Sequence, residues 1–322
     1  LALCTSNMAE PTIGPNSATQ ADDHFNTVLY TGNATDNRSI TGFGLKPDWL
    51  WIKNRSNSAS HHITDTSRGG ALRLRSNNTN VEENQTDRFT SIDTDGFTIT
   101  GSDSDTNANS NTYVAWGWKA NGGTTSSDSN GSITSTVQAN QTAGFSIVLY
   151  TGTGANATVG HGLGVAPQWI IMKRRDSSQN WVVYYADVGN DRELLLNATD
   201  AQTNSNSVYF NNTSPTSTVF SLGSDAYANA SSGTYVAYCF AEIEGYSKFG
   251  SYNGTGNADG TFIYTGFRPA WVIFKRTDST NHWLMLDNKR NVNNVVHKFL
   301  LANESDAEDT SNDQDTDFTS NG

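Results

Sequence analysis

The sequence contains few lysine, arginine and cysteine residues. Only 20 of its 322 residues are lysine or arginine, against 32 aspartates and glutamates, so its formal net charge is −12. A chain this acidic is repelled by phosphate backbones and anionic membranes, which argues against both as partners. Its two cysteines, Cys4 and Cys239, are too few for a disulfide framework, and we expect both to be unpaired structural thiols. No apolar run approaches the roughly 20 residues of a membrane-spanning helix.

Apolar and charged residues are both scarce. Hydrophobic residues make up 35% of the chain and charged residues 16%, and both fractions are below those of ordinary soluble domains. Asparagine, serine, threonine, aspartate and glycine fill the difference, and these residues disfavour helices. Aromatic residues reach 11%, enough to build cores. The composition therefore predicts strands joined by polar loops.

The chain contains a set of motifs that recurs three times, with one motif missing from the third copy. An opening motif that begins with phenylalanine occurs at residues 25–32, 145–152 and, more loosely, 249–254. A Pro-x-Trp motif ending in lysine occurs at 47–53, 167–173 and 269–275. A Tyr-Val-Ala closing motif occurs only at 112–118 and 234–240. The period is near the size of a whole domain. We therefore expect separately folded modules arranged in series.

The repeats divide the chain into five parts. We predict a leader at 1–23, the first repeat at 24–120, a Gly/Ser/Thr/Asn linker at 121–143, the second repeat at 144–244 and the third at 245–322. Several strands per repeat, separated by Gly/Asn/Asp turns, indicate an all-β chain of tandem antiparallel β-sandwiches of jelly-roll type. Within the linker, 132–137 is a candidate edge strand.

Two strand patterns are distinctive. The apolar runs 49–52, 169–172 and 271–274 are continuous, which is typical of strands covered on both faces. A lysine follows each run, and we expect its charge to reach water. The closing motif instead alternates between a small face and a bulky face, as a strand does. We interpret the short apolar runs 191–197 and 294–302 as strands rather than helices.

The third repeat lacks the closing motif. An open sandwich without that strand exposes an unpaired edge. We expect either that the protein continues beyond Gly322 or that a neighbouring subunit supplies the strand.

Residues with catalytic or metal-binding chemistry do not recur among the repeats. His61 aligns with Trp181 and Trp283, which indicates a packing or ligand-contact position rather than a general base. The pair Asp65–Arg68 recurs as Asp287–Arg290 but not in the second repeat, so we interpret it as a loop ion pair, of little energy if exposed. The segment 103–109 has alternate oxygen side chains but lacks the glycine of a calcium loop, and an Asx-rich turn explains it better. We predict no catalytic residue, no metal and no cofactor.

Loop aromatics are candidate platforms for sugar rings. The candidates are Trp181, Tyr209, Phe210 and Trp283. Half-buried aromatics also fill the cores of small sandwiches, so both interpretations stay open.

From about residue 24, these motifs resemble a repeated domain that is common in proteins encoded by marine bacteriophages. The resemblance rests on Phe25–Gly32, Gly266–Trp271, Lys275–Ser279, Phe220–Ser224 and Tyr235–Glu242. The leader resembles the end of a lectin-like sandwich domain that often precedes such repeats. The resemblance implies a virion structural protein, a tail fibre or similar appendage, with no catalytic residues to carry over.

The expected function is therefore host attachment. We expect a homo-oligomer, with a trimer favoured, on the virion surface, where multivalency turns weak contacts with a host glycan or surface protein into avidity. Other virion proteins are the remaining expected partners. One alternative is a capsid-decorating or baseplate scaffold protein that binds only virion components. A second is a polysaccharide depolymerase, which needs two carboxylates about 5–10 Å apart, and the repeats share no such pair.

Overall fold

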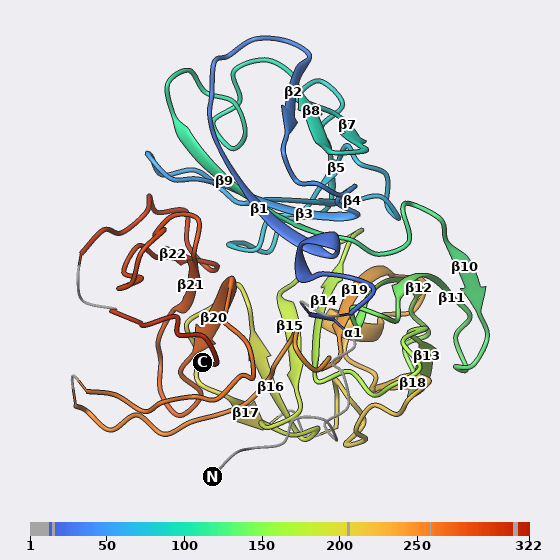
Figure 1. The fold of residues 1–322 in the computed structure, drawn as a ribbon. Coiled ribbons are helices and arrows are strands. Elements are labelled where there is room, and N and C mark those ends of the chain that lie inside the picture. The colour runs from blue at the N-terminus through green and yellow to red at the C-terminus, as the bar shows by residue number, and fades with distance from the viewer. Residues whose placement is uncertain (1–12, 15–16, 205–206, 258, 312–314) are drawn as a thin grey trace.

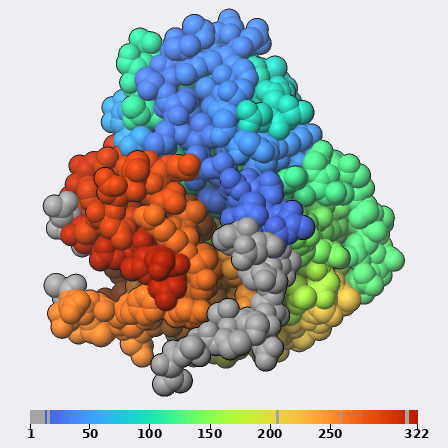
Figure 2. Space-filling model, in the orientation of Figure 1, coloured from blue at the N-terminus to red at the C-terminus, as the bar shows by residue number. Residues whose placement is uncertain are grey.

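The protein is described by a computed structural model covering residues 13–14, 17–204, 207–257, 259–311 and 315–322. Cys4 and most of the predicted leader lie outside the described residues. The described chain is nearly all β, and its strands pair antiparallel. The all-β, sandwich-type prediction is confirmed. Figures 1 and 2 show three lobes, one for each predicted repeat, gathered into a single body.

The first repeat is a sandwich of two sheets, preceded by the 3-10 helix η2 (Ala21–Asp23). Its main sheet has the order β1 (Phe25–Thr31), β9 (Thr112–Trp118), β3 (Trp49–Asn54), β4 (His62–Asp65). The second sheet has the order β2 (Arg38–Thr41), β8 (Gly96–Ile99), β7 (Phe89–Asp93), and β5 (Leu72–Arg73) pairs with β6 (Glu83–Asn84). The closing strand β9 therefore lies between the first and third strands of its repeat.

The second repeat has the same central order in a wider sheet. The order is β10 (Ser126–Asp128), β11 (Ser135–Asn140), β12 (Phe145–Thr151), β19 (Thr234–Phe240), β14 (Trp169–Arg174), β15 (Trp181–Tyr185), β16 (Arg192–Leu195), β17 (Thr203–Asn204). Strands β13 (Ala157–Gly160) and β18 (Val219–Leu222) form the second sheet, and the only α-helix of the described residues is α1 (Ala226–Asn229). The segment predicted as a linker thus contributes β10 and β11 to this sheet. The edge strand predicted at 132–137 corresponds to β11, which begins at Ser135.

The third repeat contains only a partial sheet. Its order is β20 (Trp271–Lys275), β21 (Trp283–Asp287), β22 (Leu300–Leu301). Strand β20 pairs with β21 alone, whereas β3 and β14 each pair with a closing strand as well. Every residue of β20 is partly exposed, while every residue of β3 is buried. Among the described residues, β20 therefore has one unpaired edge.

The two faces of the closing strand serve different cores. In β9, Tyr113 and Ala115 face the interior of the first sandwich. The bulky residues Val114, Trp116 and Trp118 face a second core. A Cβ on Gly117 would lie 2.6 Å from the Phe43 ring, so any side chain there would force its neighbours to shift. The predicted alternation is confirmed, and Cys239, at the same position of β19, is a buried free thiol.

The second core is shared by all three repeats. It contains side chains from each of the three main sheets, including Trp51, Trp116, Ile171, Tyr238 and Met285. Each main sheet thus has one face on its own sandwich and the other on the common core, which explains the continuous apolar runs. The expectation of modules in series is not what the structure shows, because the repeats close around one centre.

Candidate functional site

Three strand-end lysines join each repeat to the one before it. The ammonium of Lys173, after the β14 run, donates to the carbonyl oxygen of Thr79 in the first repeat at 3.0 Å and to that of Gln179 at 2.8 Å. The other two bonds of this kind run from Lys275 to Thr199 O (2.9 Å) and from Lys53 to Ser305 O (3.1 Å). The three junctions therefore form a closed cycle.

These contacts correct the expectation that the lysine charges lie in water. Lys53 and Lys173 are buried. Burial lowers the pKa of Lys53, Lys173 and Lys275 from 10.5 to about 8. The sequence pattern revealed a lysine at the end of each strand, but not that a neighbouring repeat covers it.

The position shared by His61, Trp181 and Trp283 is a junction position too. Indole Nε1 of Trp181 donates to the carbonyl oxygen of Arg75 at 2.7 Å, and that of Trp283 to the carbonyl oxygen of Leu195 at 3.0 Å. His61 Nε2 lies 3.0 Å from the carbonyl oxygen of Leu301. Each contact reaches the preceding repeat around the cycle.

His61 is held neutral by its surroundings. Its Nδ1 accepts a hydrogen bond from Trp51 Nε1 at 2.7 Å, so its Nε2 carries the proton that faces the Leu301 carbonyl. Burial lowers the pKa of His61 to about 3. A histidine with this pKa and these partners packs a junction and cannot act as a general base near neutral pH.

Buried ion pairs reinforce two of the three junctions. Arg68 is paired with Asp65, and both side chains are fully buried. Glu82 bridges Arg68 of its own repeat, at 2.8 Å, to Arg175 of the second repeat, at 2.8 Å. The same arrangement recurs between the third and first repeats through Asp287, Arg290, Glu308 and Arg55.

The third junction lacks this network. Val188 and Thr277 occupy the places of the two arginines, and Gln202 donates its backbone N–H to Thr277 O at 2.8 Å. The pairs Asp65–Arg68 and Asp287–Arg290, interpreted from sequence as loop ion pairs, are therefore parts of buried networks between repeats. The departure of the second repeat from that pattern was the available sign that the pairs are structural.

The predicted aromatic platforms are mostly inside the protein. Trp181, Trp283 and Phe210 are buried, so their ring faces are not offered to a ligand. Tyr209 is half-buried and stacks on Tyr227, with ring centroids 5.9 Å apart. Of the four candidates, only Tyr209 keeps an accessible part.

The oxygen-rich segment 103–109 is occupied by structural contacts. Asp103 pairs with Arg88, and Asp105 with Arg73. The Asp103 carboxylate also accepts the backbone N–H of Asp105 at 2.9 Å, which forms the predicted Asx turn. In the described part of the chain, no three histidine, cysteine or acidic side chains converge as a metal site would require.

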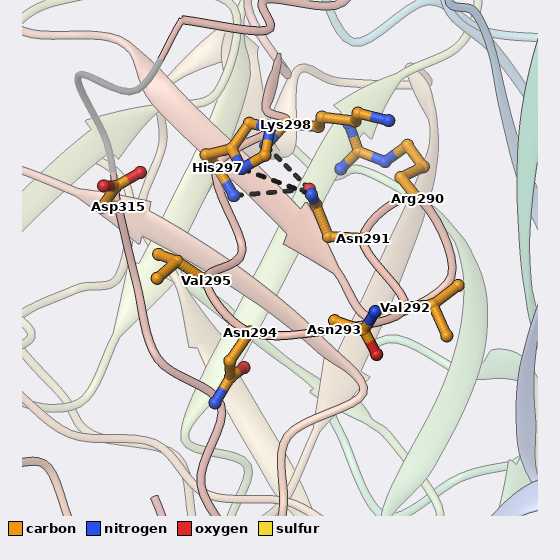
Figure 3. A pocket seen from close by; sticks show the side chains of 9 residues that line it. All are labelled: Arg290, Asn291, Val292, Asn293, Asn294, Val295, His297, Lys298 and Asp315. Atoms are coloured by element: carbon orange, nitrogen blue, oxygen red, sulfur yellow. Dashed lines mark hydrogen bonds between the residues drawn. The ribbon is translucent and has the colours of Figure 1, made fainter.

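A polar pocket follows β21 in the third repeat (Figure 3). The Asp287 carboxylate accepts the backbone N–H groups of Lys289 and Arg290, which turns the chain into a loop. That loop borders an open pocket of about 460 Å³. Its lining comprises Arg290, Asn291, Val292, Asn293, Asn294, Val295, His297, Lys298 and Asp315.

Two amides hold this loop, while other polar groups remain available. Asn291 Oδ1 accepts the backbone N–H groups of His297 and Lys298 (Figure 3). Asn294 exchanges hydrogen bonds with the backbone of Phe318. The amide of Asn293 and the ammonium of Lys298 have no hydrogen bond to a described side chain or carbonyl. The pocket lining therefore includes an amide, an ammonium and the carboxylate of Asp315.

The third repeat also exposes aromatic surface. Among the described residues, Tyr264 is 66% exposed, Phe262 59% and Tyr252 52%. We call these three residues the aromatic patch. No helix of the described residues is long and apolar enough to cross a membrane.

Comparison with known proteins yields one finding. A family described as a domain of unknown function (DUF7483) matches residues 20–322. No curated protein and no solved structure matches the chain.

Proposed function

This chain belongs to the DUF7483 family, and we propose that it is a non-catalytic structural protein of a bacteriophage virion, a tail fibre or similar appendage, that presents a host-recognition surface. The observation that supports this proposal best is that buried charged side chains connect the repeats. The junction lysines and the Glu82 and Glu308 networks all join one repeat to another. Lysine and glutamate side chains that could take part in catalysis instead hold the repeats together.

The polar pocket is the proposed recognition surface. Sugar hydroxyls donate hydrogen bonds to carboxylates, accept them from cationic groups and do both with amides. Asn293, Lys298 and Asp315 supply one group of each kind. A single shallow site of this kind binds weakly. A homo-oligomer, for which we favour a trimer, multiplies such contacts into useful avidity.

The virion assignment is tested on the particle itself. Antibody against the purified chain, coupled to gold and viewed by electron microscopy, is expected to label the tail or another projection of the phage that encodes it. Absence of the protein from purified particles, checked by mass spectrometry, would refute the virion assignment.

The glycan assignment has a separate test. The purified chain is applied to an array of bacterial surface glycans beside the variants Lys298→Ala and Lys289→Ala. Both variants lose one positive charge, but Lys289 is exposed outside the pocket. Loss of a glycan signal in Lys298→Ala alone supports the pocket. Equal signals in all three proteins would remove it as a glycan site.

One observation favours the alternative function, a decorating or scaffold protein that binds only virion components. The aromatic patch, Tyr252, Phe262 and Tyr264, is apolar and suits a protein partner better than a sugar. Gold label lying flat on the capsid or baseplate, together with a glycan array without signal, would select this alternative.

A further inference from the structure

The hairpin of β10 and β11 distinguishes the second repeat from the first. The described main sheet of the first repeat ends at β1, whereas that of the second continues past the equivalent strand β12 with β11 and β10. Figure 1 shows this hairpin at the periphery of the body. Strand β11 contributes Val137 to the core of the second sandwich, but no residue of β10 is buried. The side chains of β10 cover no core and are therefore available for another role.

The hairpin lines an open pocket of about 390 Å³, which we call the hairpin pocket. Ser126 of β10 is paired with Val137 of β11, and Asp128 lies two residues further along β10. Directly paired residues, and every second residue of a strand, share one face of a sheet. These three side chains therefore point to the same side. The lining also includes Ala139, Gln141 and, in the loop after β13, Gly162.

The loop after β13 meets the hairpin through its backbone. Gly162 has a φ of +71°, and a Cβ there would lie 2.7 Å from Val137 Cγ1 and 3.2 Å from Ala139 Cβ. A Cβ on Gly160 would lie 2.3 Å from the Asp128 carboxylate. A side chain at either glycine would therefore force the lining to shift. The pocket has its present shape because both positions lack one.

Hydrogen bonds orient the polar groups of the lining and leave several of them unused. Gln141 Nε2 donates to the carbonyl oxygen of Gly162 at 2.8 Å, which leaves its Oε1 as an acceptor. Asp128 Oδ1 accepts the backbone N–H of Asn130 at 2.9 Å and its side-chain amide at 2.8 Å. The hydroxyls of the three lining serines, at 126, 127 and 129, have no hydrogen-bond partner among the described residues. The lining therefore offers hydroxyls, an amide oxygen and an oriented carboxylate.

The charge of the lining indicates the class of ligand. Asp128 is its one charged side chain, and no lysine, arginine or histidine lines the pocket, so an anionic ligand would be repelled. Asp128 already accepts two hydrogen bonds from Asn130, so it does not require a cation as its partner. Hydroxyls donate and accept hydrogen bonds, and carboxylates accept them. Val137 and Ala139 add a small apolar surface. A neutral sugar ring, with hydroxyls at its edge and C–H groups on its face, matches this combination.

We propose that the hairpin pocket binds a neutral hexopyranose unit of a glycan. Its volume of about 390 Å³ is at the lower end of the range for small-molecule sites. This site is separate from the polar pocket of the third repeat, which contains the ammonium of Lys298. It requires neither sugar binding at that pocket nor the virion assignment. Two sites of different charge on one chain would bind a glycan of mixed sugars with avidity where their spacing allows both to engage.

The test is an NMR titration of the intact, deuterated and ¹⁵N-labelled chain with the methyl glycosides of glucose, galactose and mannose. At least one glycoside is expected to shift the amide signals of residues 126–130, 137–141 and 162 in a saturable way, with a dissociation constant of about 1–10 mM. Glucuronate is the matched ligand control, because it has the ring of glucose and a negative charge. It is expected to bind at least about tenfold more weakly than the best glycoside.

Two variants place the binding in the pocket. Ser126→Leu fills the pocket from an exposed position and is expected to abolish the shifts, whereas Thr136→Leu, exposed on the opposite face of the hairpin, is its control. Asp128→Asn is expected to weaken binding about tenfold, because a charge-assisted hydrogen bond is lost. Its control is Asp187→Asn, an exposed position of the same repeat outside the lining. Both controls are expected to bind within about twofold of the parent chain.

Several results would overturn the proposal. One is the absence of a saturable shift with all three glycosides up to about 50 mM. Another is a set of shifts confined to residues 291–298, which would leave the polar pocket as the glycan site. Unchanged binding by either pocket variant would also overturn it. Equal binding of glucuronate would refute the assignment to a neutral sugar.

Discussion

Glu82→Gln is expected to destabilise the whole protein. The Glu82 carboxylate accepts hydrogen bonds from Arg68, whose side chain is fully buried, and from Arg175 of the second repeat. Burial alone would raise the pKa of Glu82, but the hydrogen bonds and charges of the two arginines outweigh it and lower the pKa overall. The carboxylate is therefore ionised at neutral pH, and the substitution removes a charge that two cations share.

The size of the effect follows from what remains. Removing one partner of a buried ion pair costs about 3–5 kcal/mol, because the other charge is left uncompensated. Arg68 keeps Asp65 as a partner, which places the expected loss at the lower end, about 3 kcal/mol. A domain is stable by only about 5–15 kcal/mol in total. The substitution is therefore expected to remove a large fraction of the free energy of unfolding.

The assay is urea unfolding followed by tryptophan fluorescence at neutral pH. The matched control is Glu242→Gln, because Glu242 pairs with Lys248 at the surface, where both side chains are more than one-third exposed. The control is expected to change the free energy of unfolding by less than about 1 kcal/mol. A Glu82→Gln loss no greater than that of the control would refute the reasoning about buried junction networks.

Three further predictions concern other junction and core positions. Because the folded pKa of His61 is about 3 and its unfolded value 6.5, the unfolded chain takes up the proton first. Stability is then full above pH 6.5 and falls with acid by up to about 1.4 kcal/mol per pH unit for this site; equal urea midpoints at pH 7.5 and 5.5 would contradict this. Trp181→Phe leaves the Arg75 carbonyl without its donor and is expected to cost about 1–3 kcal/mol in urea unfolding; an unchanged midpoint would show that water replaces the indole. Gly117→Ala is expected to lower the melting temperature by crowding Phe43, and Phe43→Leu in the same chain, which copies the second repeat, is expected to restore part of the loss; no recovery would place the clash elsewhere.

The sequence predicted the strands and their faces well. The alternation in residues 112–118 assigned Trp116 to the bulky face and Ala115 to the small face, and the structure places them in different cores. A period-two pattern predicts the faces of a strand because successive side chains of a strand point to opposite sides of the sheet. In the described residues, the unpaired edge of β20 follows from the absence of the closing motif from residues 245–322.

The arrangement of the repeats was not predicted. A period of domain size is compatible with modules in a row and with modules around a centre, because it says nothing about which faces meet. One sign was present: the run Trp49–Ile52 is apolar on both faces, and a single sandwich covers only one of them. Lys53 is buried and Arg68 lies at a junction because the repeats close around one core. Neither could be predicted without that arrangement.

Small-angle X-ray scattering, recorded on the monomeric fraction from size-exclusion chromatography, tests most directly whether the three repeats close around one core. A single compact body of this length is expected to have a radius of gyration of about 20 Å. Three separate domains of about 100 residues set end to end would give a value above about 25 Å. The first result is the one this account predicts. The second would contradict the shared core and would indicate that the repeats are arranged in an extended row.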